Sequence, residues 1–262
     1  MENNREETAK RQIVRFKNGI KTIIDDTIVT EISFNISIQC EVVGTITCSP
    51  SHTKELTAGY LVTSGIVSKT NKLLHLEYIE DKKKFDVSLE NNNILKEKEF
   101  SVFKPLGCGA GDSLFIKIEK DKEDLPYISI QQSEISDLMK EFNKTSDLFR
   151  ETGGVHSSAL ATHKEIVVFM EDIGRHNAVD KVIGALYLNK QNFSDKILLT
   201  SGRISSEIVI KSINADIQII ISRSAPTIKA IELAEKNNIC IIGFARADNF
   251  NIYSCFEKVA FD

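Results

Sequence analysis

The chain has 262 residues, of which 42% are hydrophobic and 27% charged, and its formal net charge is −4. These values are ordinary for a globular protein with a buried core, and the acidic balance argues against broad electrostatic binding of nucleic acid. No apolar run approaches the about 18 residues of a transmembrane helix, and the five cysteines show no CxxC spacing. We therefore expect a cytoplasmic protein with neither a membrane nor a nucleic-acid partner.

The first half of the chain is predicted to contain a polar tail followed by short strands. Residues 1–15 are polar, carry mixed charge and have no apolar core, so we expect a flexible tail. Between residues 32 and 42, apolar positions alternate with mostly polar ones, as in a half-buried strand. Apolar residues at helical spacing predict a helix over 53–67, and further short strands follow it. The pattern predicts a smaller, strand-rich α+β domain over residues 16–130.

A glycine-rich segment interrupts this domain at residues 105–113. Gly107, Gly109 and Gly111 surround Cys108, so the segment cannot lie inside a regular helix or strand, and we predict a mobile loop. Neighbouring glycines leave the sulfur atom accessible, and loop amides can stabilise a thiolate. Cys108 is therefore the candidate for sulfur chemistry. The alternative is an incidental loop cysteine.

From residue 131 onward, helices alternate with short apolar strands. Helical patterns begin at Ser133, Asn177, Ile204 and Pro226, and mainly apolar runs cover 196–200, 217–221 and 239–244. Strands that are apolar throughout are typical of parallel sheets covered by helices on both faces. Residues 131–262 are therefore predicted to form an α/β domain with flanking helices.

Arginine is scarce in this chain and is concentrated after the predicted strands. Eight of the 33 basic residues are arginines, and four of the eight follow a strand of the second half. Parallel sheets bind ligands at the carboxyl ends of their strands, where helix N-termini add free N–H groups, and arginine suits phosphate. The four segments include Arg175 and His176; Ser201, Gly202 and Arg203; Ser222, Arg223 and Ser224; and Arg246, Ala247, Asp248 and Asn249.

These segments predict a site for a phosphate-bearing ligand. The alternative is that each arginine pairs with a nearby acid, the candidates being Glu171, Asp172, Glu207 and Asp248. His176 is either an acid, base or phosphate donor, or a helix-start histidine bonded to Glu171 and Asp172. His156 is either catalytic or a satisfied buried histidine.

Metal chemistry has little support in the sequence. A zinc deaminase needs an H-x-E motif and a P-C-x-x-C motif. His156-Ser157-Ser158 lacks the glutamate, and the segment 201–206 lacks both cysteines. We therefore expect no zinc and no other metal site.

Several motifs of the second half carry a family resemblance. They read ETGGVH at 151–156, EDIGRHNAVDK at 171–181, SGR at 201–203 with EIV at 207–209, SAPT at 224–227, and GFAR at 243–246. In order and spacing over residues 25–255, the chain resembles the formate dehydrogenase accessory sulfurtransferase family, FdhD.

The resemblance implies a sulfur carrier with a persulfide intermediate. Such proteins take sulfur from a cysteine desulfurase and bind the Mo-bis(molybdopterin guanine dinucleotide) cofactor, bis-MGD, or its tungsten form. They pass sulfur to the metal before the cofactor enters the client, formate dehydrogenase. The resemblance further implies a homodimer and, in the second half, a cytidine-deaminase-like mixed sheet without its zinc site. Cys108 falls on the persulfide cysteine, and the cofactor-binding stretch falls on Phe244, Ala245, Arg246, Ala247, Asp248 and Asn249.

The chain departs from the family pattern in two places. The family usually has C-G-x-C in the loop, whereas Gly111 stands here in place of the second cysteine. This change favours an alternative, a cofactor-binding chaperone for formate dehydrogenase without sulfur transfer. The family also often has a glycine and a basic residue after the arginine, where this chain has Ala247, Asp248 and Asn249.

Overall fold

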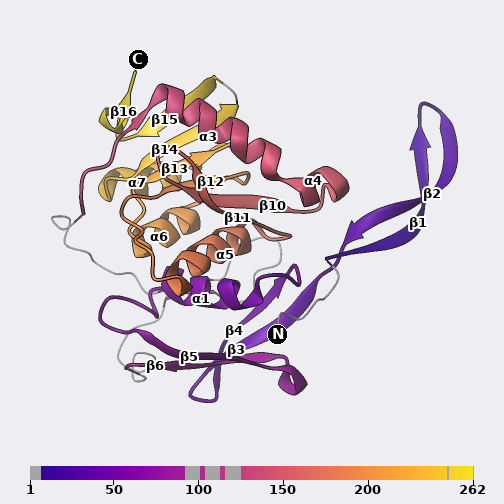
Figure 1. The fold of residues 1–262 in the computed structure, drawn as a ribbon, viewed down its shortest axis with the longest axis horizontal. Coiled ribbons are helices and arrows are strands. Elements are labelled where there is room, and N and C mark those ends of the chain that lie inside the picture. Colours follow the sequence, from indigo (N-terminus) through magenta and orange to yellow (C-terminus); the bar gives the residue numbers. More distant parts are fainter. Residues whose placement is uncertain (1–6, 92–100, 104–112, 116–124, 247, 262) are drawn as a thin grey trace.

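The structure, a computed structural model, describes residues 7–91, 101–103, 113–115, 125–246 and 248–261. It is a mixed α/β fold with several sheets (Figure 1). Cys108 and Ala247 lie outside the described residues, so their predicted roles stay predictions. None of the helices in the described ranges is both long and apolar enough to span a bilayer.

A six-stranded sheet organises the second half of the chain. Its strand order is β11-β10-β12-β13-β14-β15. The parallel pairs predicted from the apolar runs are confirmed for β12, β13 and β14, whereas β10, β11 and β15 run antiparallel to their neighbours. The strands are β10 (His156–Ala161), β11 (Ile166–Asp172), β12 (Ile197–Thr200), β13 (Ile219–Ser222), β14 (Cys240–Arg246) and β15 (Asn249–Ser254).

Helices cover both faces of this sheet, because its central strands are apolar on both sides. Leu198 and Ile220 point into one core cluster, and their neighbours Leu199 and Ile221 point into another. The second cluster lies under α3 (Gln132–Thr145), and the short α4 (Asp147–Thr152) follows it. The first is covered by α5 (Arg175–Leu188), α6 (Ser206–Asn214) and α7 (Ile228–Lys236).

A four-stranded sheet in the first half lies beyond these helices (Figure 1). Its order is β4-β3-β6-β5, and α1 (Thr53–Thr63) lies between it and α5. The strands are β3 (Ile32–Ile38), β4 (Glu41–Cys48), β5 (Leu73–Ile79) and β6 (Lys84–Leu89), with the 3-10 turn η1 (Glu80–Lys82) between β5 and β6. Phe34 and Leu56 share a core cluster with Val179 and Leu198, so this core spans the predicted boundary between 16–130 and 131–262. The division into two domains stays a prediction.

Three short pairings complete the described elements. β7 (Ser101–Phe103) pairs antiparallel with β8 (Ser113–Phe115). β9 (Ile130–Gln131) pairs in parallel with β16 (Val259–Ala260), which follows the 3-10 turn η3 (Phe256–Lys258). The third pairing is a long hairpin of β1 (Thr8–Lys17) and β2 (Ile20–Val29).

The hairpin corrects the prediction of a tail over residues 1–15. Residues 8–15 lie in β1, which pairs with β2 along its whole length. The turn residues Asn18 and Gly19 have φ of 52° and 81°, the left-handed geometry that tight hairpin turns require and that Asn-Gly adopts readily. The local turn therefore decides the structure of a segment whose charge suggested a solvated tail.

The helices α1 and α5 cross in backbone contact. A Cβ atom on Gly59 would lie 1.8 Å from the carbonyl oxygen of Asp180, and one on Gly184 would lie 1.8 Å from that of Glu55. No side chain fits at either position. The two glycines therefore set the distance between the first half of the chain and the large sheet.

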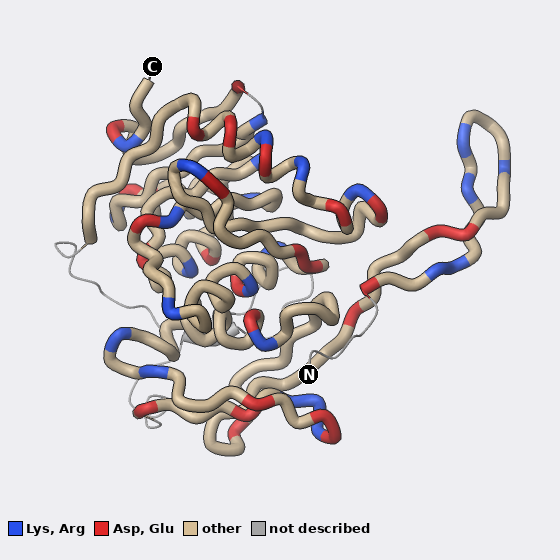
Figure 2. Tube along the Cα trace, viewed as in Figure 1, with Lys and Arg blue, Asp and Glu red and all other residues tan. Residues whose placement is uncertain are grey.

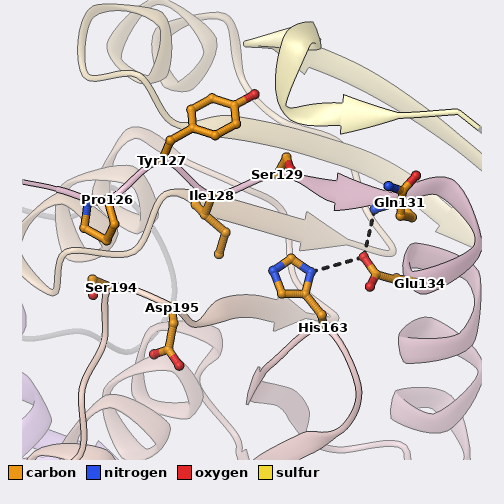
Figure 3. A pocket seen from close by; sticks show the side chains of 9 residues that line it. All are labelled: Pro126, Tyr127, Ile128, Ser129, Gln131, Glu134, His163, Ser194 and Asp195. Carbon is orange, nitrogen blue, oxygen red and sulfur yellow. Dashed lines mark hydrogen bonds and ion pairs between the residues drawn. The ribbon is translucent and has the colours of Figure 1, made fainter.

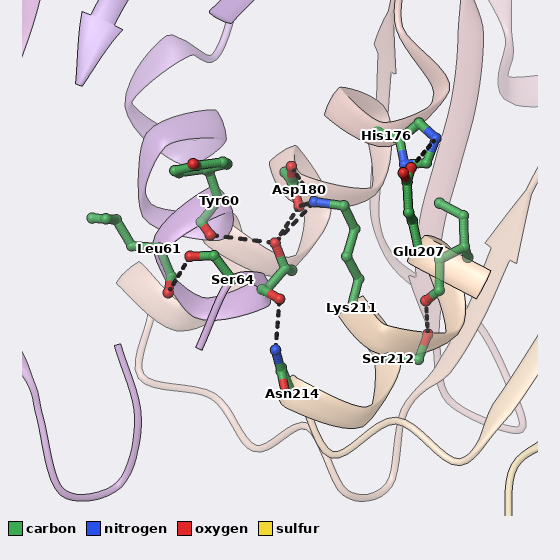
Figure 4. Close-up of polar contacts among 11 residues, drawn as sticks. Tyr60, Leu61, Ser64, His176, Asp180, Glu207, Lys211, Ser212 and Asn214 are labelled. Atoms are coloured by element: carbon green, nitrogen blue, oxygen red, sulfur yellow. Dashed lines mark hydrogen bonds and ion pairs between the residues drawn. The ribbon is translucent and has the colours of Figure 1, made fainter. Parts of the chain in front are cut away.

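A buried polar network ties α1, α5 and α6 together (Figure 4). Lys211 Nζ donates to the two carboxylate oxygens of Asp180 at 2.7 and 2.8 Å, and the Thr63 hydroxyl donates to the same carboxylate at 2.6 Å. Asn214 donates to the carbonyl oxygen of Thr63 at 2.8 Å. Each of the three helices thus contributes a buried polar side chain whose hydrogen bonds are made by the other helices.

Candidate functional site

One edge of the six-stranded sheet collects the predicted binding segments. The carboxyl ends of β12, β13 and β14 meet there because these strands are parallel. β10 runs antiparallel to β12, so its first residue, His156, and the carboxyl end of β11 lie at the same edge. We call this edge, with Arg175, Arg203, Arg223 and Arg246, the arginine edge.

Hydrogen bonds fix three of these segments to one another. The backbone N–H of Arg223 donates to the carbonyl oxygen of Thr200 at 3.2 Å. The Ser222 hydroxyl donates to the carbonyl oxygen of Gly202 at 2.7 Å. The backbone N–H of Phe244 donates to the carbonyl oxygen of Ser224 at 3.1 Å. The loops after β12 and β13 and the end of β14 therefore form one rigid rim.

Arg175 is the first residue of α5 and packs against the loop after β12. A Cβ atom on Gly202 would lie 2.9 Å from Cβ of Arg175, so glycine is required for this approach. The Nε atom of Arg175 is shielded from solvent and has no hydrogen-bond partner among the described residues. An unpaired buried donor costs free energy, and a ligand oxygen would satisfy it.

The buried carboxylate of Asp172 holds the start of α5 in place. It forms an ion pair with Lys181 at 2.8 Å, and both side chains are fully buried. It also accepts from the backbone N–H groups of Gly174 at 2.8 Å and Ser49 at 3.1 Å, and from the Asn177 amide at 2.9 Å. The N-cap residue Gly174 offers no side-chain cap, so N–H groups at this helix start are left for a ligand.

The alternative that the four arginines pair with nearby acids is wrong for the described residues. Asp172 binds Lys181, as described above. Glu171 accepts from the Ser146 hydroxyl at 2.6 Å and from two backbone N–H groups at the start of α4. Glu207 pairs with His176 at 3.2 Å, and Asp248 pairs with Lys140 of α3 at 3.2 Å. All four acids are thus engaged elsewhere, and the arginine edge keeps its positive charge.

His176 is a neutral histidine, and its partner differs from the one we predicted. Its Nε2 atom lies 3.2 Å from Glu207, rather than beside Glu171 or Asp172. Burial, reinforced by the charges of Lys211 and Arg175, lowers the pKa of His176 to about 3. At neutral pH, the imidazole therefore donates its one N–H to Glu207 and can accept a proton only at Nδ1.

His156 belongs to the site, although the sequence left its role open. Its Nδ1 atom lies 3.3 Å from the hydroxyl of Ser201, which also accepts from the backbone N–H of Ser157 at 3.0 Å. Burial lowers the pKa of His156, as do the charges of Arg175 and Arg203. Sequence reasoning missed this placement, because only the antiparallel direction of β10 brings its first residue to the arginine edge.

Phe244 presents an aromatic ring at the carboxyl end of β14. Its φ of 52° lies in the left-handed region, and its side chain is 44% exposed. A register shift between Gly243 and Arg246 accompanies this geometry. A non-glycine residue held there costs free energy, and residues in such conformations cluster at functional sites. The hairpin continues through Arg246, which pairs with Asn249 in register.

A cavity of about 420 Å³ lies at the opposite edge of the sheet (Figure 3). His163, from the turn between β10 and β11, lies 3.1 Å from Glu134 of α3. Asp195 lines the same cavity just before β12. None of the predicted site residues lines it. Among the described residues, no group of three His, Cys, Asp or Glu side chains is placed to hold a metal ion.

Residues 29–260 match the model of the FdhD/NarQ family. The chain belongs to this family.

Full-length relatives agree with the assignment. "Sulfur carrier protein FdhD" of Bacillus licheniformis is 34% identical over 258 residues, which cover 97% of this chain and 98% of the relative. The protein of the same name from Staphylococcus aureus is 34% identical over 260 residues, or 98% of each chain. A crystal structure described as a putative formate dehydrogenase accessory protein from Desulfotalea psychrophila aligns with a TM-score of 0.77 at 22% identity, covering 97% of this chain and 100% of that one. This likeness shows a shared fold.

Proposed function

We propose that this FdhD-family protein is a cytoplasmic sulfurtransferase that supports formate dehydrogenase. It takes sulfur from a cysteine desulfurase as a persulfide on Cys108 and transfers it to the bis-MGD cofactor of molybdenum or tungsten. The observation that carries the proposal is the arginine edge, whose four arginines have no carboxylate partner among the described residues. Relatives of nearly the same length are named sulfur carriers, which supports the sulfur chemistry.

The arginine edge suits the pyrophosphates of a guanine dinucleotide. Arginine donates to phosphate oxygens in pairs, and the free N–H groups at the start of α5 add to the positive potential. The exposed ring of Phe244 offers a flat apolar face for a base or a pterin. The neutral His156 and His176 add polar groups without adding charge.

The sulfur step is a thiolate exchange followed by delivery. The Cys108 thiolate attacks the outer sulfur of the donor persulfide, a new S–S bond forms, and the donor cysteine leaves as a thiolate. On delivery, the outer sulfur leaves Cys108 as sulfide, the acceptor metal supplies two electrons, and the Cys108 thiolate is regenerated. Because Gly111 replaces the second loop cysteine, release through a disulfide within the loop is not available.

Further parts of this proposal come from the family resemblance. They are the division at residues 130 and 131, the homodimer, and the likeness of the second half to cytidine deaminases. The mixed six-stranded sheet with helices on both faces supports that likeness.

Persulfide mapping tests the sulfur step. The protein is incubated with a cysteine desulfurase and cysteine, and intact mass and peptide mapping follow. We expect one added sulfur atom on Cys108, which is lost in Cys108→Ser and kept in Cys40→Ser, a variant at an exposed cysteine. If wild-type protein gains no sulfur yet binds the cofactor, the chaperone alternative favoured by Gly111 is correct.

Titration calorimetry with guanosine diphosphate tests the arginine edge. Arg203→Ala and Arg223→Ala should each weaken binding by roughly tenfold, because each removes charged hydrogen bonds to phosphate. Arg150→Ala is the matched control, since Arg150 pairs with Asp147 in α4 and lies outside the rim. Equal affinity in all three variants would place the nucleotide elsewhere.

A further inference from the structure

The cavity at the edge of the large sheet opposite the arginine edge has the composition of a ligand site (Figure 3). Its volume of about 420 Å³ is within the usual range of small-molecule pockets. Pro126 and Ile128 form an apolar part of its wall, whereas Glu134, His163 and Asp195 bring polar atoms to it. An apolar wall with a few well-placed polar groups is typical of pockets that hold small molecules.

At one end of the cavity, Glu134 and His163 form a fixed pair. The Oε2 atom of Glu134 accepts from the backbone N–H of Gln131 at 2.8 Å and lies 3.1 Å from Nδ1 of His163. The backbone bond belongs to the capping box at the start of α3, so the carboxylate is held in place by the helix. Because a carboxylate only accepts, Nδ1 donates to it, and Nε2 of the neutral ring is left as an acceptor.

This pair keeps two acceptor atoms open. Neither Oε1 of Glu134 nor Nε2 of His163 has a hydrogen-bond partner among the described residues. Figure 3 shows Nε2 pointing away from Glu134, toward the side of the cavity that Ile128 and Asp195 line. A ligand with N–H donors can therefore bind both atoms at once.

Asp195 supplies a second carboxylate from the segment before β12. Its Oδ1 atom accepts from Nζ of Lys196 at 2.6 Å, and its Oδ2 atom has no partner among the described residues. Asp195, like Glu134, is thus held through one oxygen and offers the other.

The lining of the cavity is negatively charged. None of the described residues that line it is a lysine or an arginine, whereas Glu134 and Asp195 are both acids. Lys196 offsets part of the charge of Asp195. Lys258, which lies near the ring of Tyr127, is bound to another side chain at 2.8 Å. Figure 2 shows acidic and basic residues interspersed along the second half of the chain, so the negative lining is a local feature. The cavity therefore favours a cation, whereas the arginine edge favours an anion.

We propose that this cavity binds a linear aliphatic polyamine. Aliphatic amines are protonated at neutral pH, and each ammonium group has three N–H donors. One end of the ligand donates to Oε1 of Glu134 and Nε2 of His163, and the other end donates to Oδ2 of Asp195. The methylene chain between the two ends lies against Pro126 and Ile128.

The chemistry of the lining disfavours other small ligands. An amino acid or a nucleotide carries anionic groups, which would lie beside carboxylates with no lysine or arginine in the described lining to receive them. A metal ion lacks ligands, because no three His, Cys, Asp or Glu side chains of the described residues are placed to hold one. The inference does not depend on the proposed sulfur transfer.

Titration calorimetry of the full-length protein with spermidine tests the proposal. Wild-type protein should bind spermidine at least about tenfold more tightly than butylamine, which has one ammonium group and reaches one carboxylate. Glu134→Gln and Asp195→Asn should each weaken spermidine binding by roughly tenfold. Glutamine also closes a capping box, so Glu134→Gln keeps the start of α3. Glu165→Gln is the matched control, because Glu165 is exposed in the same turn as His163 and does not line the cavity.

Nitrogen-15 NMR of the histidine rings gives a second readout on the wild-type protein. Spermidine should shift the Nε2 resonance of His163 and leave the ring of His75 unchanged. His75 is the matched control, since it forms a similar pair with Glu77 at 3.2 Å on an exposed strand outside the cavity.

Four results would each overturn the proposal. They are no binding of spermidine to wild-type protein, equal affinity for spermidine and butylamine, a loss in Glu165→Gln as large as in the two cavity variants, and a shift of His75 as large as that of His163. Circular dichroism checks that each variant is folded. The persulfide on Cys108 and the binding of guanosine diphosphate should be unaffected by the cavity variants, so failure here leaves the proposed function standing.

Discussion

Lys211→Met tests how far the buried charge pair between α5 and α6 stabilises the fold. Asp180 and Lys211 are 2% and 3% exposed, and two hydrogen bonds of 2.7 and 2.8 Å join them. Removing one partner of such a pair leaves a buried charge uncompensated, at a typical cost of about 3–5 kcal/mol. The Thr63 hydroxyl still donates to Asp180 and offsets part of that cost. We expect the free energy of unfolding to fall by about 2–4 kcal/mol at neutral pH.

The loss should depend on pH with a definite sign. Burial raises the pKa of Asp180, and Lys211 opposes that rise, so Lys211→Met raises the pKa further. A carboxyl group whose pKa is higher in the folded state stabilises the fold while it is protonated, and the stabilisation is lost as the pH rises through that pKa. The deficit of Lys211→Met should therefore grow as the pH rises above the ordinary pKa of an aspartate, by no more than about 1.4 kcal/mol per pH unit.

Urea titrations followed by circular dichroism measure both effects. Asp180→Leu/Lys211→Met removes both charges and should recover most of the stability, since no buried charge is left unpaired. Lys229→Met is the control for losing one lysine from an exposed helix position. The reasoning fails if Lys211→Met unfolds within about 1 kcal/mol of wild type at neutral pH, or if its deficit shrinks as the pH rises.

Three other outcomes can be checked directly. Because the pKa of His176 is about 3, NMR should show no titration of its ring between about pH 5 and pH 8. The stability that the neutral ring contributes should be complete above about pH 6.5 and be lost as the pH falls. A ring that titrates near its ordinary pKa would contradict this. Gly184→Ala drives a Cβ atom into the backbone of α1, so Tm should fall by about 6 °C or more. An unchanged Tm would mean that the two helices separate freely. Lys54→Ala, on the exposed face of α1, is the control for a substitution by alanine that does not touch the helix contact. Burial raises the pKa of Cys240 to about 12, so iodoacetamide at about pH 8 should modify the exposed Cys40 and spare Cys240 in the native protein; equal labelling by peptide mapping would refute the assignment.

The large sheet could be predicted because burial on both faces leaves its central strands mainly apolar. β12, β13 and β14 were visible for that reason, and the helices between them followed from the helical spacing of their apolar residues. Helix starts were less accurate. Ile204, predicted to open a helix, instead forms a bridge with Pro226, and α6 begins at Ser206. A tertiary contact at the helix end decides such a boundary, and local pattern does not contain it.

The hairpin of β1 and β2, by contrast, could not be predicted from a pattern of apolar residues. Its Asn18-Gly19 turn is visible in the sequence, yet its strands carry apolar and charged residues on both faces, so no pattern separates a buried side from an exposed one. A strand that packs against no core gives a weak periodic signal. The tail that we predicted over residues 1–15 was therefore wrong from residue 8 onward.

The gathering of the arginines at one edge was predictable because parallel strands end at the same edge of a sheet. The absence of ion pairs between these arginines and nearby acids was not predictable, because Glu207 and Asp248 lie close enough in sequence to pair with them. The structure directs those acids to His176 and to Lys140 instead. Side-chain direction in a loop depends on what packs around it, and the sequence of the loop alone does not determine it.

The contact between Asp172 and Ser49 has a consequence for how the protein is made. Asp172 accepts from the backbone N–H of Ser49, and Ser49 accepts from that of Ile173, across about 123 residues of chain. During synthesis, Ser49 leaves the ribosome long before its partner exists, and closing so long a loop is slow. The arginine edge can therefore be completed only late in folding, once both halves of the chain are available. A truncated product that ends before β11 would carry the cysteine segment but lack the whole arginine edge.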